Sequence, residues 1–250
     1  MKRLASTFSY SIGKKMIMGL TGLFLIVFLV EHLIGNLLLL SGPAAFNGYA
    51  EFMGTNPLVR AMEFVLFGGF IFHIVDGLML KMQNSKARPI GYAVKAGSKN
   101  ASWFSKNMAV TGVILLIFFI LHLISFFIKA RFNADVTFGI NPANWEGSWL
   151  AEGDYGVSAE HPFSMYHKAA MLFSIPWYSI IYIVAMLVVM GHLLHGFQSA
   201  FQTLGINHPK YTPLIKAIGY GYAVLVPLGF CVIPVAFMIH PVIPAIPPIG

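Results

Sequence analysis

The stretch TGLFLIVFLVEHLIGN, residues 21–36, decides the fold. An unbroken apolar run follows Thr21-Gly22 and ends at an adjacent acid and histidine, Glu31 and His32. With its flanks the run is long enough to cross a bilayer, where ionisable groups are expensive and mark functional positions. The stretch therefore predicts a membrane helix with a functional site inside it.

The composition extends this prediction to the whole chain. Of its 250 residues 57% are hydrophobic and only 10% are charged, whereas a soluble domain carries about 25% charged residues. The lone cysteine, Cys231, excludes internal disulfides, cysteine-ligated zinc, iron–sulfur clusters and thioether-linked haem. The sequence contains neither a GxGxxG nor a GxxxxGK loop, so no nucleotide or flavin site is visible in it. The composition thus favours an all-α integral membrane protein.

Five segments are long and apolar enough to span a bilayer: 16–40, 60–81, 107–129, 174–203 and 214–240. We expect one membrane domain over 1–250, with one long outer loop at 130–173. Twelve basic residues fall on the side of the N-terminus and four on the other side, which predicts an inside N-terminus and an outside C-terminus. The net charge of +7 therefore reflects topology and a possible docking face for a cytoplasmic partner, not nucleic-acid binding.

The first and third spans repeat one pattern. MGLTGLFLIVFLVEHLIGN at 18–36 and MAVTGVILLIFFILHLISF at 108–126 share Thr-Gly, nine intervening residues and His-Leu-Ile. Both helices run outward, so His32 and His122 lie at similar depth, about 25 Å from the inner edge. His73 on the second span lies about 12 Å from that edge, near the level of His192 and His195 on the fourth. We call His32 and His122 the outer pair, and His73 with a histidine of the fourth span the inner pair.

A single membrane histidine is often an ordinary interhelical hydrogen-bond group. Four on successive helices, paired by depth, favour ligation instead, and neutral imidazole is a standard haem ligand. Neither pair comes with a thiolate or carboxylate cluster, so haem fits better than copper or zinc. The interpretation is a bundle of four antiparallel helices enclosing two stacked b-type haems.

The repeated Thr-Gly lies three turns inward of each outer histidine, on nearly the same face. Gly22 and Gly112 would leave room for a porphyrin edge, and the hydroxyls of Thr21 and Thr111 would bond a haem propionate. The alternative is close helix packing by small residues.

The pattern resembles the di-haem cytochrome b membrane subunit of succinate dehydrogenases and fumarate reductases, of the single-chain, five-helix type. The resemblance covers nearly the whole chain and rests on TGLFL…EH (21–32), FHIVDG (72–77), TGVILLIFFILHL (111–123) and HLLHGFQSAFQTLG (192–205). The segment after His195 looks most like the version of Bacteroidetes-like bacteria.

The resemblance implies iron ligation by His32 and His122 at the outer haem and by His73 and one histidine of the fourth span at the inner haem. Family members place that ligand 13 residues before a helix-ending glycine. Gly205 selects His192 by this rule, which leaves His195 for a propionate or for the partner subunit. One branch of the family carries a proton-transferring glutamate where this chain has Met190.

The resemblance further implies a multi-pass subunit of the bacterial inner membrane. It would bind flavoprotein and iron–sulfur subunits on the cytoplasmic side and exchange electrons with quinone, leaning to menaquinone, in succinate oxidation or fumarate reduction. At the depth of the outer haem, Glu31 and Glu63 are the candidates for quinone protonation, since burial disfavours a charged carboxylate. The alternatives are a haem-free, proton-coupled transporter that uses intramembrane His and Glu, and a plain structural anchor.

Overall fold

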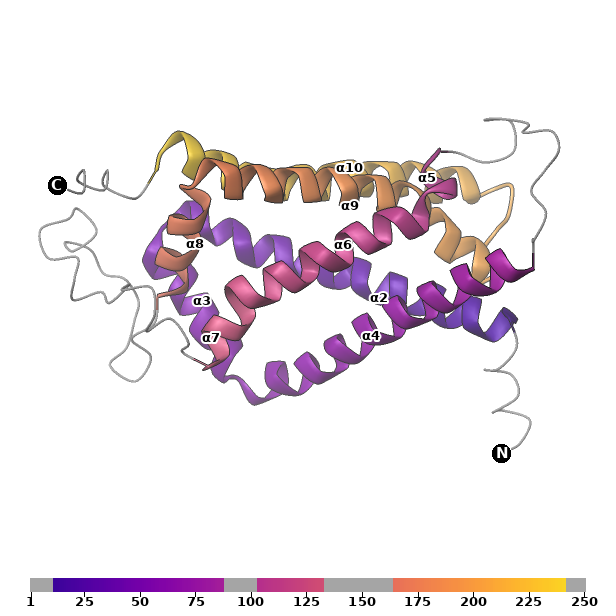
Figure 1. Ribbon diagram of the computed structural model, residues 1–250, viewed down its shortest axis with the longest axis horizontal. Helices are drawn as coiled ribbons and strands as arrows, with labels where there is room; N and C mark the ends of the chain where they lie inside the picture. Colours follow the sequence, from indigo (N-terminus) through magenta and orange to yellow (C-terminus); the bar gives the residue numbers. More distant parts are fainter. Residues whose placement is uncertain (1–10, 88–102, 133–163, 242–250) are drawn as a thin grey trace, which may run out of the picture. The chain divides into compact units, whose positions relative to one another are not determined.

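The computed structural model describes residues 11–87, 103–132 and 164–241. Every element in these ranges is a helix (Figure 1). Contacts divide the chain into two compact units, and the division cuts each of the five long apolar helices. Unit 1 contains 1–30, 63–116 and 187–227, and unit 2 contains 31–62, 117–186 and 228–250. Each unit is described by itself, and the single membrane domain stays a prediction.

Five helices are long and apolar enough to cross a membrane, which confirms the number of spans expected from the sequence. They are α2 (Ser11–Leu37), continued by the 3-10 turn η1 (Leu38–Ser41); α4 (Pro57–Lys86); α6 (Met108–His122), continued by the π-helical turn η3 (Leu123–Phe127) and α7 (Ile128–Phe132); α9 (Pro176–Thr203); and α10 (Thr212–Ile239). The second span is longer at both ends than expected.

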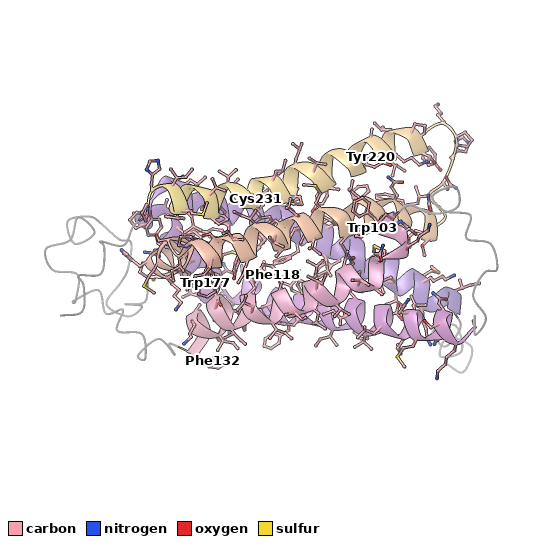
Figure 2. All side chains as sticks on the ribbon, turned by 45° about the horizontal axis from the view of Figure 1, so that its top comes forward. Trp103, Phe118, Phe132, Trp177, Tyr220 and Cys231 are labelled. Carbon is pink, nitrogen blue, oxygen red and sulfur yellow. The ribbon has the colours of Figure 1, made fainter. Side chains whose placement is uncertain are left out.

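The exposed side chains agree with a lipid environment. Large apolar residues on the spans face outward, among them Val27, Phe64 and Leu225, each at least 70% exposed. Trp103, at the start of the short helix α5 (Trp103–Lys106), and Trp177, in the first turn of α9, are 66% and 63% exposed and are labelled in Figure 2. Tryptophan at helix ends is typical of the membrane–water interface.

The helix ends follow from local chemistry. Gly42 adopts φ 106°, where only glycine is unstrained, and Pro43 then begins α3 (Pro43–Thr55). The Asn56 side chain accepts from the backbone N–H of Leu58 at 2.9 Å and so caps α4. Gly205 (φ 77°) ends α9 in a Schellman motif, with Ile206 N–H bonded to Phe201 O at 3.0 Å. This is the helix-ending glycine used above to choose His192.

Besides the short helix α5, two helices of the described residues lie outside the spans. One is α3, and the other is α8 (Met165–Phe173), which occupies the end of the expected 130–173 loop. The rest of that loop, 133–163, lies outside the described residues. Since α3 and α8 pack on each other within unit 2, part of the segment beyond the spans is a folded layer.

A buried polar cluster joins these two helices. Ser164 Oγ accepts from Asn47 Nδ2 at 2.9 Å and from the His167 backbone N–H at 3.2 Å. Its own proton is then left for His167 Nδ1, 2.6 Å away. The His167 ring is therefore the acceptor and neutral, in agreement with its burial, which lowers the pKa of His167.

Candidate functional site

The inner pair comes together in unit 1. His73 on α4 and His192 on α9 have ring centroids 6.4 Å apart, with the ring planes at 69°. A metal bound by one nitrogen from each side, at about 2 Å per bond, holds two imidazole centres roughly 6 Å apart. The spacing of these two rings would therefore suit two imidazoles that bind one metal.

A threonine hydroxyl contacts the Nδ1 atom of each inner histidine. Thr21 Oγ1 lies 3.3 Å from His73 Nδ1, and Thr111 Oγ1 lies 3.1 Å from His192 Nδ1. A partner at Nδ1 leaves Nε2 as the ligating nitrogen, which is the usual arrangement of a metal-binding histidine. The structure places both hydroxyls beside histidine rings. The propionate contacts expected for them stay a prediction.

The glycine beside each threonine faces the same ring. A Cβ on Gly22 would lie 3.4 Å from His73 Cε1, and one on Gly112 would lie 3.8 Å from His192 Cε1. Each Thr-Gly of the repeat thus packs against the histidine of the next span in the chain. At both copies of the repeat, the glycine allows close packing and the threonine places a hydroxyl at the same ring.

The outer pair comes together in unit 2. His32 on α2 and His122, the last residue of α6, have ring centroids 5.7 Å apart at 88°. Asn36 Nδ2 lies 3.3 Å from His32 Nδ1 and 3.5 Å from His32 Nε2, and it donates to the His32 carbonyl at 2.7 Å. Tyr182 OH approaches His122 Nδ1 at 3.5 Å, the limit of a hydrogen bond. The outer histidines therefore have an amide and a phenol near Nδ1 where the inner histidines have hydroxyls.

Aromatic side chains surround His122. Phe118, labelled in Figure 2, lies one turn before it at 6.0 Å between ring centroids, and Phe126 lies at 5.4 Å. Phe126 belongs to the π-helical turn η3, which begins directly after His122. Such turns are rare and frequent at functional sites. Aromatic rings thus surround His122, which suits contact with a large planar apolar group.

Glu31 has a partner that the sequence did not indicate. Tyr49 on α3 donates from its hydroxyl to Glu31 Oε1 at 2.6 Å. Gly35, one turn after Glu31, makes room for this, because a Cβ there would overlap the Tyr49 hydroxyl and ring. Burial, and then the bond to Glu31, raises the pKa of Tyr49, so the phenol stays protonated and remains the donor.

The other predicted residues are placed less decisively. His195 lies one turn after His192 and is half-buried. Glu63 on α4 is also half-buried. It belongs to unit 1, whereas Glu31 belongs to unit 2. Asp76, one turn after His73, is 5% exposed, and its Oδ2 has no hydrogen-bond partner among the described residues. Lys14 is its charged neighbour.

Sequence reasoning missed Tyr49, Asn36 and Tyr182. Asn36 could have been found, since it lies four residues after His32 on the same helix face. Tyr49 and Tyr182 contact the site only through tertiary packing, for which one sequence holds no signal.

Within 11–87, 103–132 and 164–241, no three His, Cys, Asp or Glu side chains gather as ligands for a bare metal ion. Each pair offers two imidazoles. Two axial nitrogens fit a metal whose remaining positions are filled by a macrocycle, as in haem.

Comparison with known proteins returns one informative relative. No family model matches the chain, and no solved structure matches it. The chain is similar to a curated protein of Bacillus subtilis (strain 168), the succinate dehydrogenase cytochrome b558 subunit. The two are 29% identical over 153 residues, which is 60% of this chain and 72% of that protein.

Proposed function

We propose that this chain is the di-haem cytochrome b membrane subunit of a succinate:quinone oxidoreductase. It would carry electrons between a flavoprotein–iron–sulfur dehydrogenase and membrane quinone, in succinate oxidation or fumarate reduction. The observation that carries the proposal is the pairing of four imidazoles from four different spans, each pair at a spacing suited to one metal. The similarity to a succinate dehydrogenase cytochrome b subunit supports it independently.

The four histidines are the residues that would hold the two haems b. His73 and His192 would ligate the inner haem, and His32 and His122 the outer one. When bound, each haem supplies a one-electron carrier within the apolar bundle. The chain's own part is to present Nε2 of each ring, to keep the rings in register and to exclude water with apolar side chains such as Phe118 and Phe126. His195 is proposed as a propionate contact.

Glu31 is proposed to handle the protons that accompany quinone reduction. Glu31 directly precedes His32 in the sequence, and its carboxylate accepts from the Tyr49 hydroxyl at 2.6 Å. The hydrogen bond fixes Oε1 in one position and leaves Oε2 for proton exchange. A positioned carboxyl of this kind contributes about 10²–10⁴-fold in general acid–base steps. Glu63 is the second candidate, on α4.

The partners and the orientation belong to the same proposal. The flavoprotein and iron–sulfur subunits would dock on the cytoplasmic face, at the basic N-terminus and the basic loop after α4. Much of both segments lies outside the described residues. The membrane would be the bacterial inner membrane, with the C-terminus outside and menaquinone as the electron acceptor.

The experiment is a pair of activities measured on membranes with and without this chain. Succinate-dependent reduction of a menaquinone analogue should require the chain, whereas succinate oxidation by a soluble artificial acceptor should not. Addition of succinate should also reduce the b haems, which is seen as a change in their absorption bands. Full quinone reduction without the chain would refute the proposal, and so would membranes in which the bands never respond to succinate or fumarate.

A further inference from the structure

We propose that Thr21 and Thr111 are positioning residues, which set the tautomer and the orientation of the His73 and His192 rings. The inference rests on the proposed function, since it concerns how the chain presents those rings to a haem. It is carried by two contacts of the same kind, at equivalent places of an internal repeat, each to the histidine of the next span.

The hydroxyl of each threonine donates to a backbone carbonyl of its own helix. Thr21 Oγ1 donates to Ile17 O at 2.8 Å, which is shorter than its 3.3 Å contact to His73 Nδ1. A threonine hydroxyl has one proton and two lone pairs. When the proton points to the carbonyl, the oxygen can only accept from the ring. Nδ1 of His73 therefore carries the hydrogen, and the lone pair of the neutral ring is at Nε2. The backbone of Met18, on the same helix as Thr21, also hydrogen-bonds the His73 ring.

The second copy repeats the arrangement. Thr111 Oγ1 donates to Met108 O at 3.0 Å and lies 3.1 Å from His192 Nδ1. Thr111 is buried, at 7% exposure, so water does not compete for the ring N–H. Both inner histidines are thus held in the tautomer that a haem iron requires, by an acceptor that cannot itself take up a proton near neutral pH.

Each repeat helix serves both pairs. Helix α2 contributes Thr21 to the inner pair and His32 to the outer pair, and α6 contributes Thr111 and His122 in the same way. This explains why Thr-Gly and His recur together at one fixed spacing. It also adds a structural reason for His192 over His195, because His192 is the ring that Thr111 contacts.

An accepted Nδ1–H hydrogen bond raises the basicity of the ligating nitrogen. A more basic ligand stabilises the oxidised iron, so loss of the bond should move the inner haem to a more positive midpoint potential. Mutation of such partners typically weakens metal affinity 10–100-fold. We therefore expect about tenfold weaker retention of the inner haem in Thr21→Val and Thr111→Val, with the outer haem unchanged.

The test is a redox titration of the purified complex, followed in the b-type bands, together with haem content after competition with apo-myoglobin. Thr→Val removes the hydroxyl at nearly constant shape, and Thr→Ser restores it. Thr55→Val is the matched control, since Thr55 Oγ1 bonds its own helix at Glu51 O, 2.8 Å away on α3. The His192→Ala variant identifies which transition belongs to the inner haem. If a valine variant fails to assemble, Thr→Ala removes the same hydroxyl without bulk.

The expected result is a positive shift and weaker retention of the inner haem in the valine or alanine variants, with wild-type values in the serine and Thr55→Val variants. Valine variants with wild-type potentials and retention would overturn the inference and leave the proposed function intact. Serine variants as altered as the valine variants would overturn it too, because shape rather than the hydroxyl would then matter. A wild-type complex without haem would overturn the proposed function itself.

Discussion

The Tyr49–Glu31 hydrogen bond allows a graded test of the proton route. Tyr49→Phe removes only the hydroxyl that donates to Glu31 Oε1 at 2.6 Å. A hydrogen bond to a charged group is worth about 1.5–3 kcal/mol, and Glu31 is exposed, which reduces the value to about 1 kcal/mol. Since 1.36 kcal/mol corresponds to tenfold in rate, Tyr49→Phe should slow quinone reduction about fivefold.

Glu31→Gln should slow quinone reduction far more than Tyr49→Phe does, if the carboxyl exchanges the proton. General acid–base groups contribute about 10²–10⁴-fold, so the loss should exceed that of Tyr49→Phe by at least tenfold. Gly35→Ala should resemble Tyr49→Phe, because the added methyl occupies the place of the Tyr49 ring and forces it out. The three variants should therefore slow quinone reduction in a fixed order, with Glu31→Gln the slowest and the other two alike.

The assay is quinone-analogue reduction by succinate in the intact complex, with succinate oxidation by a soluble acceptor as the internal control. Haem content should stay at the wild-type value in all three variants. Tyr220→Phe is the matched control, since Tyr220 is an exposed tyrosine of α10 (Figure 2). Equal rates for Glu31→Gln and the wild type would refute the role of Glu31. A Glu31→Gln effect no larger than that of Tyr49→Phe would refute proton exchange at the carboxyl.

Three further predictions concern other residues. His195→Gln should keep both haems, whereas His192→Gln should lose the inner one; haem loss in His195→Gln alone would exchange the two assignments. Glu63→Gln should slow quinone reduction with unchanged haem spectra, and normal turnover would remove Glu63 from the proton route. Acidification should weaken the α3–α8 layer: the lowered pKa of His167 means that the unfolded state binds a proton first, so stability falls as pH drops below about 6.5. The contribution of His167 to the slope is at most about 1.4 kcal/mol per pH unit, measured through the thermal midpoint in detergent, and the slope should be smaller in His167→Asn.

The five spans could be predicted because each is a long apolar run, a signal that depends on composition alone. The helix-ending glycine could also be read from sequence: Gly205 adopts the positive φ that a Schellman motif requires. By contrast α3 and α8 are short helices with mixed polarity, and their burial depends on a partner helix far away in the sequence. Asn47 and Ser164, which join them, are 117 residues apart.

The histidine pairs could be predicted because the repeat places His32 and His122 in register and helix rise gives depth. Their immediate surroundings could not. The sequence placed Thr21 on the correct face but not at Nδ1 of His73, since that contact depends on how far two helices approach. The π-helical turn after His122 likewise has no single-sequence signature, although it brings Phe126 onto the ring of His122.

Four histidines from four spans are proposed to hold two b haems in two pairs. The measurement is haem content per chain, with the reduced-minus-oxidised spectrum, for the purified wild type and for alanine variants of His32, His73, His122 and His192. We expect two haems in the wild type. His32→Ala and His122→Ala should lose the same haem, and His73→Ala and His192→Ala should lose the other. A wild type without b-type bands, or losses that follow any other pairing, would contradict this proposal.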